Sequence, residues 1–211
     1  MITVTIDGEK KQYPAGVSYE SIADAYQEKY DGLIGLVAVD GKIKELFKQL
    51  KKDCEISFFT LKDDVGHKTY VRTATMLFLK AVADVFGDDV AQIARVEFAV
   101  KNGTYISAGE KLPGTKENAG KIFNRMQELQ KQAVPFMKDS YYMDDAMAIF
   151  KEKGMKDKER LFRYRRSSMV NLYEIDGYMD YYYGYMLPNA GYVKWFDVIA
   201  YDEGFMLLLP D

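Results

Sequence analysis

Histidine and cysteine are almost absent from this chain of 211 residues, which has one of each, His67 and Cys54. A single cysteine excludes an internal disulfide framework and is typical of a reducing cytoplasm. A zinc site usually needs three or four ligands, drawn mainly from cysteine and histidine, so no metal site is expected. The alternating pattern around Cys54 predicts a strand residue with a buried side chain. His67 is expected in a polar linker.

Long apolar runs are missing as well. No stretch approaches the roughly 20 apolar residues that span a bilayer, and the N-terminus lacks the basic and apolar regions of a signal peptide. The formal net charge of −3 argues against a general nucleic-acid or anionic-membrane surface, although a local patch remains open. We therefore expect a cytoplasmic protein with no membrane partner.

Nucleotide-binding motifs are also absent. The sequence contains no GxxxxGK[ST] loop and no GxGxxG after a predicted strand, so neither an ATP–Mg site nor a dinucleotide site is expected in this chain. A Ser-His-Asp triad would have to use His67. Asp176 and Asp180 are close enough in sequence for a paired-carboxylate hydrolase, but nothing specific distinguishes them from other carboxylates.

Periodicity and turn residues predict an α+β chain. Residues 1–61 read as four strands around one helix opened by Ser18, with turns at Asp7-Gly8 and Asp40-Gly41, which is typical of a ubiquitin-like β-grasp. Residues 61–70 are polar and contain a glycine, and we place a domain boundary there. Beyond it, helices are expected at residues 73–86, 113–131 and 144–153, and strands at 96–100, 168–175 and 193–209.

Charge is unevenly distributed along the second half. Between Lys151 and Arg166 eight basic residues meet three acidic ones, whereas from Leu172 to Asp211 a single lysine meets seven carboxylates. One interpretation is two solvated faces that pair with each other. The other is a patch that contacts RNA phosphates, formed by Arg163, Arg165 and Arg166 beside a tyrosine.

Tyrosines gather near the C-terminus. Six lie within fifteen positions, and strand alternation would send Tyr181, Tyr183 and Tyr185 to one face and Tyr182 to the other. These rings are either the core and rim of a sheet or a platform on which a base stacks.

The order of these segments resembles the N-terminal part of threonyl-tRNA synthetases. Residues 1–61 are similar to their TGS domain through Val4-Thr5-Ile6-Asp7-Gly8, Ala38-Val39-Asp40-Gly41-Lys42 and Asp53-Cys54-Glu55-Ile56-Ser57-Phe58. Residues 62–211 are similar to the editing-type domain through Arg72-Thr73-Ala74-Thr75-Met76-Leu77, Lys101-Asn102-Gly103-Thr104-Tyr105, Pro135-Phe136 and Asp180 to Gly191. The resemblance implies a β-grasp domain followed by an α+β editing-type domain.

The residues that carry editing chemistry in that family are replaced here. Its HxxxH helix motif falls on Arg72 and Met76, and its CxxxH loop falls on Tyr182 and Met186. Arginine is no base at neutral pH and a thioether is a poor zinc ligand, so we expect neither a catalytic residue of the family's kind nor a metal. What remains is a candidate ligand cleft lined by Arg72, Met76, Asp180, Tyr182, Tyr183, Tyr185 and Met186.

The loss of all four positions also resembles bacterial uridine kinase-like proteins, which join the same two domains to a P-loop nucleoside kinase domain. This implies a non-catalytic binding or regulatory module for RNA or a nucleotide, whose partner is its own kinase domain; ATP and Mg would serve only that absent domain. The apolar end at Leu207–Asp211 is typical of a boundary within a longer chain. The alternatives are a metal-independent hydrolase of mischarged tRNA and a structural scaffold that sets a homo-oligomeric state.

Overall fold

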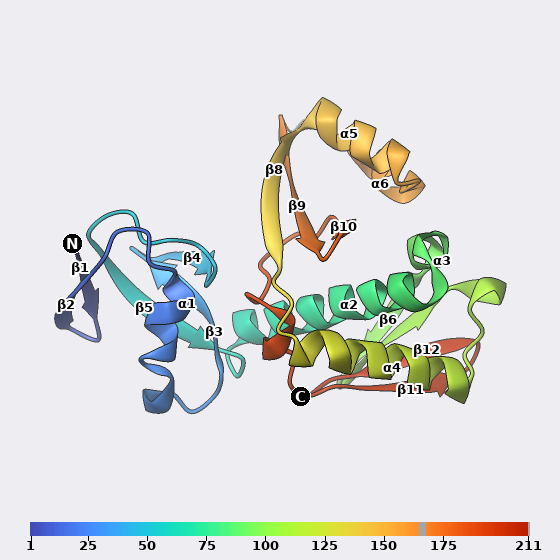
Figure 1. Ribbon diagram of the computed structural model, residues 1–211, viewed down its shortest axis with the longest axis horizontal. Coiled ribbons are helices and arrows are strands. Elements are labelled where there is room, and N and C mark those ends of the chain that lie inside the picture. The colour runs from blue at the N-terminus through green and yellow to red at the C-terminus, as the bar shows by residue number, and fades with distance from the viewer. Residues whose placement is uncertain (165–167, 211) are drawn as a thin grey trace.

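The computed structural model describes residues 1–164 and 168–210 and shows an α+β fold (Figure 1). Its N-terminal part is a five-stranded sheet in the order β2-β1-β5-β3-β4, with β1 and β5 parallel. The strands are β1 (Ile2–Ile6), β2 (Glu9–Tyr13), β3 (Ile34–Val39), β4 (Lys42–Glu45) and β5 (Cys54–Thr60). The sequence predicted four strands and missed β4, which is short and largely polar.

The local sequence accounts for the turns and helix of this part. Asp7-Gly8 and Asp40-Gly41 have positive φ at both residues, as the type I′ turn of a two-residue hairpin requires. Helix α1 (Tyr19–Asp24) begins after Ser18, whose side chain accepts a hydrogen bond from the Ser21 backbone, as predicted. It is followed by the short η1 (Gln27–Lys29). Cys54 lies at the start of β5, as its pattern predicted, but its side chain is half-buried and not buried.

The polar stretch after β5 is helical, not a linker. Helix α2 (Asp64–Phe86) begins well before residue 73, so it includes His67. The Asp63 carboxylate accepts hydrogen bonds from the backbone and hydroxyl of Thr60, which turns the chain into the helix. Gly66 is required here because a Cβ would lie 1.9 Å from the Thr60 carbonyl oxygen. Polarity therefore marked the start of a helix and not a linker, while the domain division at residue 61 stays a prediction.

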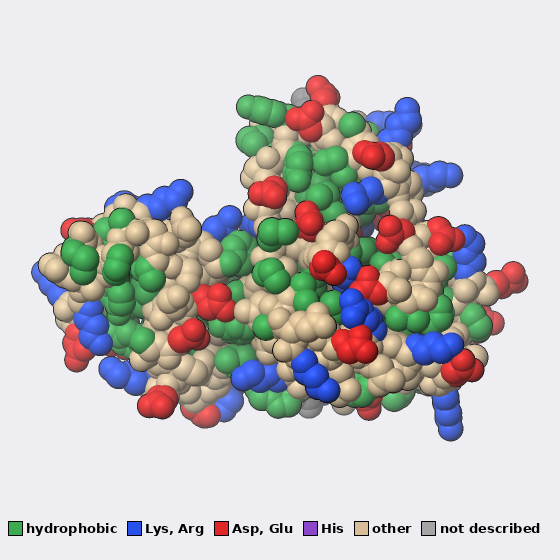
Figure 2. All heavy atoms as spheres, in the orientation of Figure 1, with side chains coloured by type: hydrophobic (Ala, Val, Ile, Leu, Met, Phe, Trp, Pro, Cys, Tyr) green, Lys and Arg blue, Asp and Glu red, His purple; other side chains and the backbone are tan. Residues whose placement is uncertain are grey.

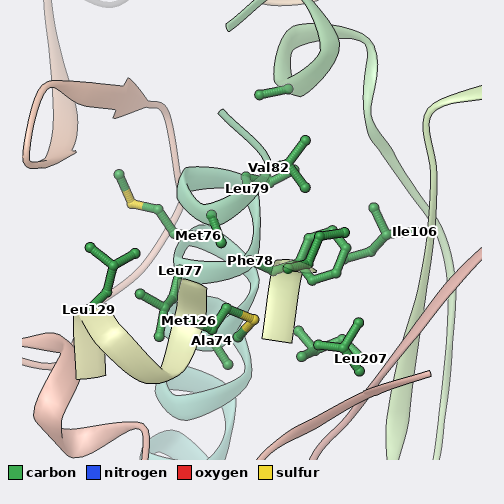
Figure 3. Packing of buried hydrophobic residues seen from close by; sticks show 14 of the residues in the cluster. Ala74, Met76, Leu77, Phe78, Leu79, Val82, Ile106, Met126, Leu129 and Leu207 are labelled. Atoms are coloured by element: carbon green, nitrogen blue, oxygen red, sulfur yellow. The ribbon is translucent and has the colours of Figure 1, made fainter. Parts of the chain in front are cut away.

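Helix α2 crosses a second, four-stranded antiparallel sheet in the order β11-β12-β7-β6. Figure 1 shows α2 and α4 side by side over this sheet. Figure 3 shows the core between the layers, with Met126 and Leu129 of α4 and Ile106 and Leu207 of the sheet around α2. The elements are α3 (Asp88–Ile93), β6 (Arg95–Val100), β7 (Gly103–Ser107), η2 (Gly109–Lys111), α4 (Lys116–Lys131), η3 (Ala190–Tyr192), β11 (Asp197–Tyr201) and β12 (Gly204–Leu208).

A third sheet projects from the body of the molecule. Strands β8 (Met137–Tyr142), β9 (Met169–Ile175) and β10 (Tyr178–Asp180) form an antiparallel sheet in the order β10-β9-β8. Helices α5 (Met143–Glu152) and α6 (Lys156–Phe162) follow β8 and lie at its far end (Figure 1). They share a small separate core with the hairpin, centred on Phe150, Phe162 and Leu172. In the described part of the chain, no helix has the length and apolarity needed to cross a membrane.

Candidate functional site

The positions that match the family's two motifs are brought together. Arg72 on α2 donates from Nη1 to the backbone oxygen of Tyr185 at 2.7 Å. Its guanidinium lies against Gly184, where a Cβ would be 2.6 Å from Arg72 Cζ. Burial lowers the pKa of the Arg72 guanidinium below its usual value, although an arginine stays charged at neutral pH. Arg72 therefore faces the loop of Tyr182 to Met186 and holds its backbone.

Side chains fill the space between these motifs. Met76 and Met186 are fully buried, and Figure 3 shows Met76 on the opposite side of α2 from Phe78. Thr73 Oγ1 donates to the Thr69 carbonyl and accepts from the Leu187 backbone at 3.0 Å. The same oxygen is 3.5 Å from Met186 Sδ. The thioether sulfurs of Met76 and Met186 are therefore not accessible to a substrate.

The tyrosine segment forms a loop. Strand β10 ends at Asp180, so the predicted alternation of Tyr181 to Tyr185 across a sheet is wrong. Tyr183 is 85% exposed, whereas Tyr182 lies inside and its hydroxyl is buried. Gly184 has a φ of +123°, which no extended strand residue adopts, so the segment does not continue as a strand into Tyr185. Tyr185 is the residue whose carbonyl accepts the hydrogen bond from Arg72.

A cavity of about 210 Å³ opens one helical turn beyond the filled motif. Thr75 and Leu79 of α2 form its floor, and residues of α3, of the α5–α6 corner and of β10 form its walls. The cavity therefore lies where the projecting hairpin and its two helices fold back over the body. It receives polar side chains from three separate elements, including Lys158, Asp180 and Tyr182.

Asp180 and Lys158 form an ion pair at this cavity. Lys158 Nζ is 3.3 Å from Asp180 Oδ1 and 3.2 Å from Asp157 Oδ2. Asp180 is 6% exposed, and its Oδ1 also accepts a hydrogen bond from the Tyr181 backbone at 2.6 Å. Burial raises the pKa of Asp180 although Lys158 opposes the rise. For Lys158, burial lowers the pKa but the carboxylates of Asp180 and Asp157 outweigh it, so its pKa is raised.

Tyr182 contributes a polar group with unsatisfied hydrogen-bonding capacity. Its hydroxyl is buried and has no hydrogen-bond partner among the described residues. Burial raises the pKa of this hydroxyl well above its usual value, and the nearby charge of Asp180 adds to the rise. An unsatisfied buried hydroxyl costs about 1–3 kcal/mol. Tyr182 is also one of the residues that line the cavity.

Sequence reasoning found part of this arrangement. Asp180 and Tyr182 line the cavity as members of the candidate cleft, whereas Lys158 was missed because it lies in a run of charges where no pattern distinguishes one lysine. Asp176 does not join Asp180: its carboxylate pairs with Lys80 at 3.2 Å.

The expected phosphate patch is described only in part. Arg163 is exposed at the end of α6, while Arg165 and Arg166 lie outside the described residues. Within residues 1–164 and 168–210, no three histidine, cysteine, aspartate or glutamate side chains are grouped so that they could hold a metal ion.

Comparison with known proteins relates the whole arrangement to one class of enzyme. The chain is 25% identical over 210 residues to the threonine–tRNA ligase of Symbiobacterium thermophilum, an alignment that covers 97% of this chain and 32% of the relative. It is 28% identical over 193 residues to the ligase of Maricaulis maris, covering 90% and 30%. It is 28% identical over 148 residues to that of Pelagibacter ubique, covering 70% and 23%.

The chain spans less than a third of the length of these relatives. No protein-family model matches it. All three relatives are threonine–tRNA ligases, and they give no support to the expected uridine kinase context. Over nearly its whole length, this chain is similar to a part of threonine–tRNA ligases.

Proposed function

We propose that this chain binds the aminoacylated 3′ end of a tRNA and hydrolyses the ester without a metal ion. The similarity to threonine–tRNA ligases supports a tRNA-related role. The observation that carries the chemistry is the convergence of the Asp180–Lys158 pair and the unpartnered Tyr182 hydroxyl on one cavity. The proposed activity corresponds to the metal-independent hydrolase that the sequence leaves open as an alternative.

Asp180 is the base in this proposal. Its pKa is raised by burial, which makes its carboxylate a stronger base than an ordinary aspartate, while Lys158 keeps it ionised. The carboxylate takes a proton from a water molecule as the water oxygen forms a bond to the ester carbonyl carbon. The bond from that carbon to the ribose oxygen then breaks, and Asp180 returns the proton to the leaving ribose oxygen.

Lys158 and Tyr182 stabilise the charge that develops on the carbonyl oxygen. The side chain of Lys158 is 21% exposed, so the field of its ammonium is screened less than that of a fully exposed lysine. The Tyr182 hydroxyl, which has no partner among the described residues, donates its hydrogen bond to the same oxygen. In this proposal Asp180, Lys158 and Tyr182 together take the place of the imidazoles that the family's motifs have lost.

A binding module without chemistry is the second candidate. It is favoured by the burial of Met76 and Met186 and by the hydrogen bond of Arg72 to the Tyr185 carbonyl, which leave these three of the four motif positions without a role in catalysis. In that case the cavity recognises a tRNA end or a nucleotide for another domain. A nucleoside kinase as that other domain, or a purely structural scaffold, rests on the sequence resemblance alone.

The experiment is a deacylation assay. A panel of aminoacyl-tRNAs with labelled amino acids is incubated with the wild type, Asp180→Asn, Lys158→Met and the control Asp145→Asn, an exposed residue of α5. We expect hydrolysis of at least one substrate above the buffer rate, and a fall of about 10²-fold or more in Asp180→Asn, the range of general-base contributions. Binding with no hydrolysis by the wild type selects the second candidate, and neither binding nor hydrolysis rejects both.

A further inference from the structure

The corner between α5 and α6 has two faces. Gly154, with φ +69°, ends α5, and the Met155 backbone donates to the Phe150 carbonyl at 2.7 Å, the bond of a Schellman turn. This turn packs on α3, because a Cβ on Gly154 would be 2.9 Å from the Gln92 side chain. On its inner face, Lys153 and Lys158 line the cavity. The outer face carries a shallow depression.

The outer depression is strongly basic. Lys151, Lys156, Arg160 and Arg163 line it, with Glu159 as the single carboxylate. All four cations are exposed, and none makes an ion pair with a carboxylate of the described residues. Figure 2 shows lysine and arginine side chains, in blue, at the outer edge of the α5–α6 region. Like charges held this close repel one another, so the surface attracts anions.

An aromatic ring completes the depression. Tyr164 lines it at the end of α6 and is 82% exposed, beyond the reach of the small core under these helices. An exposed ring among several cations matches a single-stranded nucleic acid, whose phosphates take the cations and whose bases stack on the ring. An acidic peptide would use the cations but not the ring.

We propose that the outer face of the α5–α6 corner binds the single-stranded 3′ segment of an RNA and leads its last nucleotide into the cavity. The corner is the shared wall: Lys151 and Lys156 lie outside it, while Lys153 and Lys158 lie inside it. Cations therefore line both faces of the corner, and in this proposal they hold the phosphates of the RNA on both sides of it. This inference rests on the proposed function, because it supplies the route by which a tRNA end reaches the cavity.

The test measures binding of a 5′-labelled, 12-nucleotide single-stranded RNA ending in CCA, by fluorescence anisotropy between 50 and 200 mM salt. The variant K151A/K156A/R160A should bind at least tenfold more weakly at 50 mM salt. Its slope of log affinity against log salt should be shallower by about 2, since each lost single-strand phosphate contact removes about 0.7. Thermal melting checks that the fold is retained.

The control K116A/K131A/K194A removes the same charge from exposed lysines on other elements. It should change the affinity less than twofold and leave the salt slope unchanged. Tyr164→Ala should weaken binding about fivefold or more, and Tyr164→Phe should restore it, because stacking needs the ring and not the hydroxyl.

The outcomes separate this inference from the proposed function. Equal weakening in both triple variants, or displacement of the RNA by polyglutamate at equal charge concentration, would refute the α5–α6 route. The proposed function would still stand if the wild type hydrolyses aminoacyl-tRNA in its own assay. If the wild type does not hydrolyse aminoacyl-tRNA but the substitution of Lys151, Lys156 and Arg160 still weakens RNA binding, the route is supported and the binding module without chemistry is the proposed function that remains.

Discussion

The hydroxyl oxygen of Tyr173 lies 2.6 Å from Glu45 Oε1, so a strand of the projecting hairpin is bonded to a strand of the β-grasp part. The same hydroxyl lies 2.6 Å from the Gly184 carbonyl, beside the Arg72 anchor. A phenol has one proton, so it donates to one of the two oxygens at a time. Lys138 donates to the same Glu45 oxygen at 2.7 Å. The network ties three segments that are distant in sequence.

Glu45→Ala should strongly destabilise the protein. Glu45 is 3% exposed, and its loss leaves the Lys138 ammonium and the Tyr173 hydroxyl without their carboxylate. Breaking a buried pair by removing one partner costs about 3–5 kcal/mol. Urea unfolding followed by the fluorescence of Trp195 measures the loss. The control Glu55→Ala, on the exposed side of β5, should stay within about 0.5 kcal/mol of the wild type.

Only part of the fold could be predicted from the sequence. Asp-Gly turns and the Ser18 cap are local, and they folded as their residues dictate. The start of α2 was missed because it depends on Gly66 passing close to the Thr60 carbonyl, a contact that exists only in the folded chain. A short-range contact between the end of β5 and the first turn of α2 thus overrode the polar composition that had predicted a linker.

The candidate site could also be predicted only in part. Motif alignment grouped Arg72 with the loop of Tyr182 to Met186, and Arg72 does donate a hydrogen bond to the Tyr185 carbonyl of that loop. Lys158 was beyond reach, because its pairing with Asp180 depends on how the α5–α6 corner folds back. A charge run does not reveal which of its members is turned inward.

Gly184→Ala tests the anchor of the tyrosine loop. Both the φ of +123° and the contact of 2.6 Å with Arg72 Cζ oppose a Cβ at this position. We expect a loss of about 2 kcal/mol or more in the free energy of unfolding. Gly177→Ala is the matched control, because it has φ +82° but nothing within 4 Å, so it should lose only about 1 kcal/mol. Equal losses would mean that the Arg72 contact carries no strain.

Asp180 should make stability fall as pH rises. Its pKa is raised by burial above the usual 3.8, so the folded protein binds this proton more tightly than the unfolded chain. Between the usual and the raised pKa, the unfolded state therefore holds fewer protons and the free energy of unfolding decreases with pH. Asp180→Asn does not titrate, so wild-type stability relative to the variant should decline across this window and level off above it.

The variant Lys158→Met tests whether Lys158 limits the rise in the pKa of Asp180. Lys158 opposes the rise in the pKa of Asp180, so its removal should extend the declining window to higher pH. Urea unfolding at half-unit steps from pH 3.5 to 8 provides both curves. A relative stability that rises with pH would show that Asp180 is stabilised as a carboxylate and would remove its role as a strengthened base.

Tyr182→Phe should stabilise the protein and impair its function at the same time. The Tyr182 hydroxyl is buried without a partner among the described residues, so its removal relieves a desolvation cost and should raise the free energy of unfolding by up to about 1 kcal/mol. The proposed function uses that hydroxyl to bind the ester oxygen, so ligand binding or hydrolysis should fall about tenfold or more. Tyr26→Phe is the control for hydrolysis: its hydroxyl is also buried, but the Lys11 and Tyr13 side chains lie beside it in the β-grasp core, away from the cavity. It should leave hydrolysis unchanged. If Tyr182→Phe instead lowers stability, the hydroxyl has a structural partner such as an ordered water, and its assignment to the ligand is wrong.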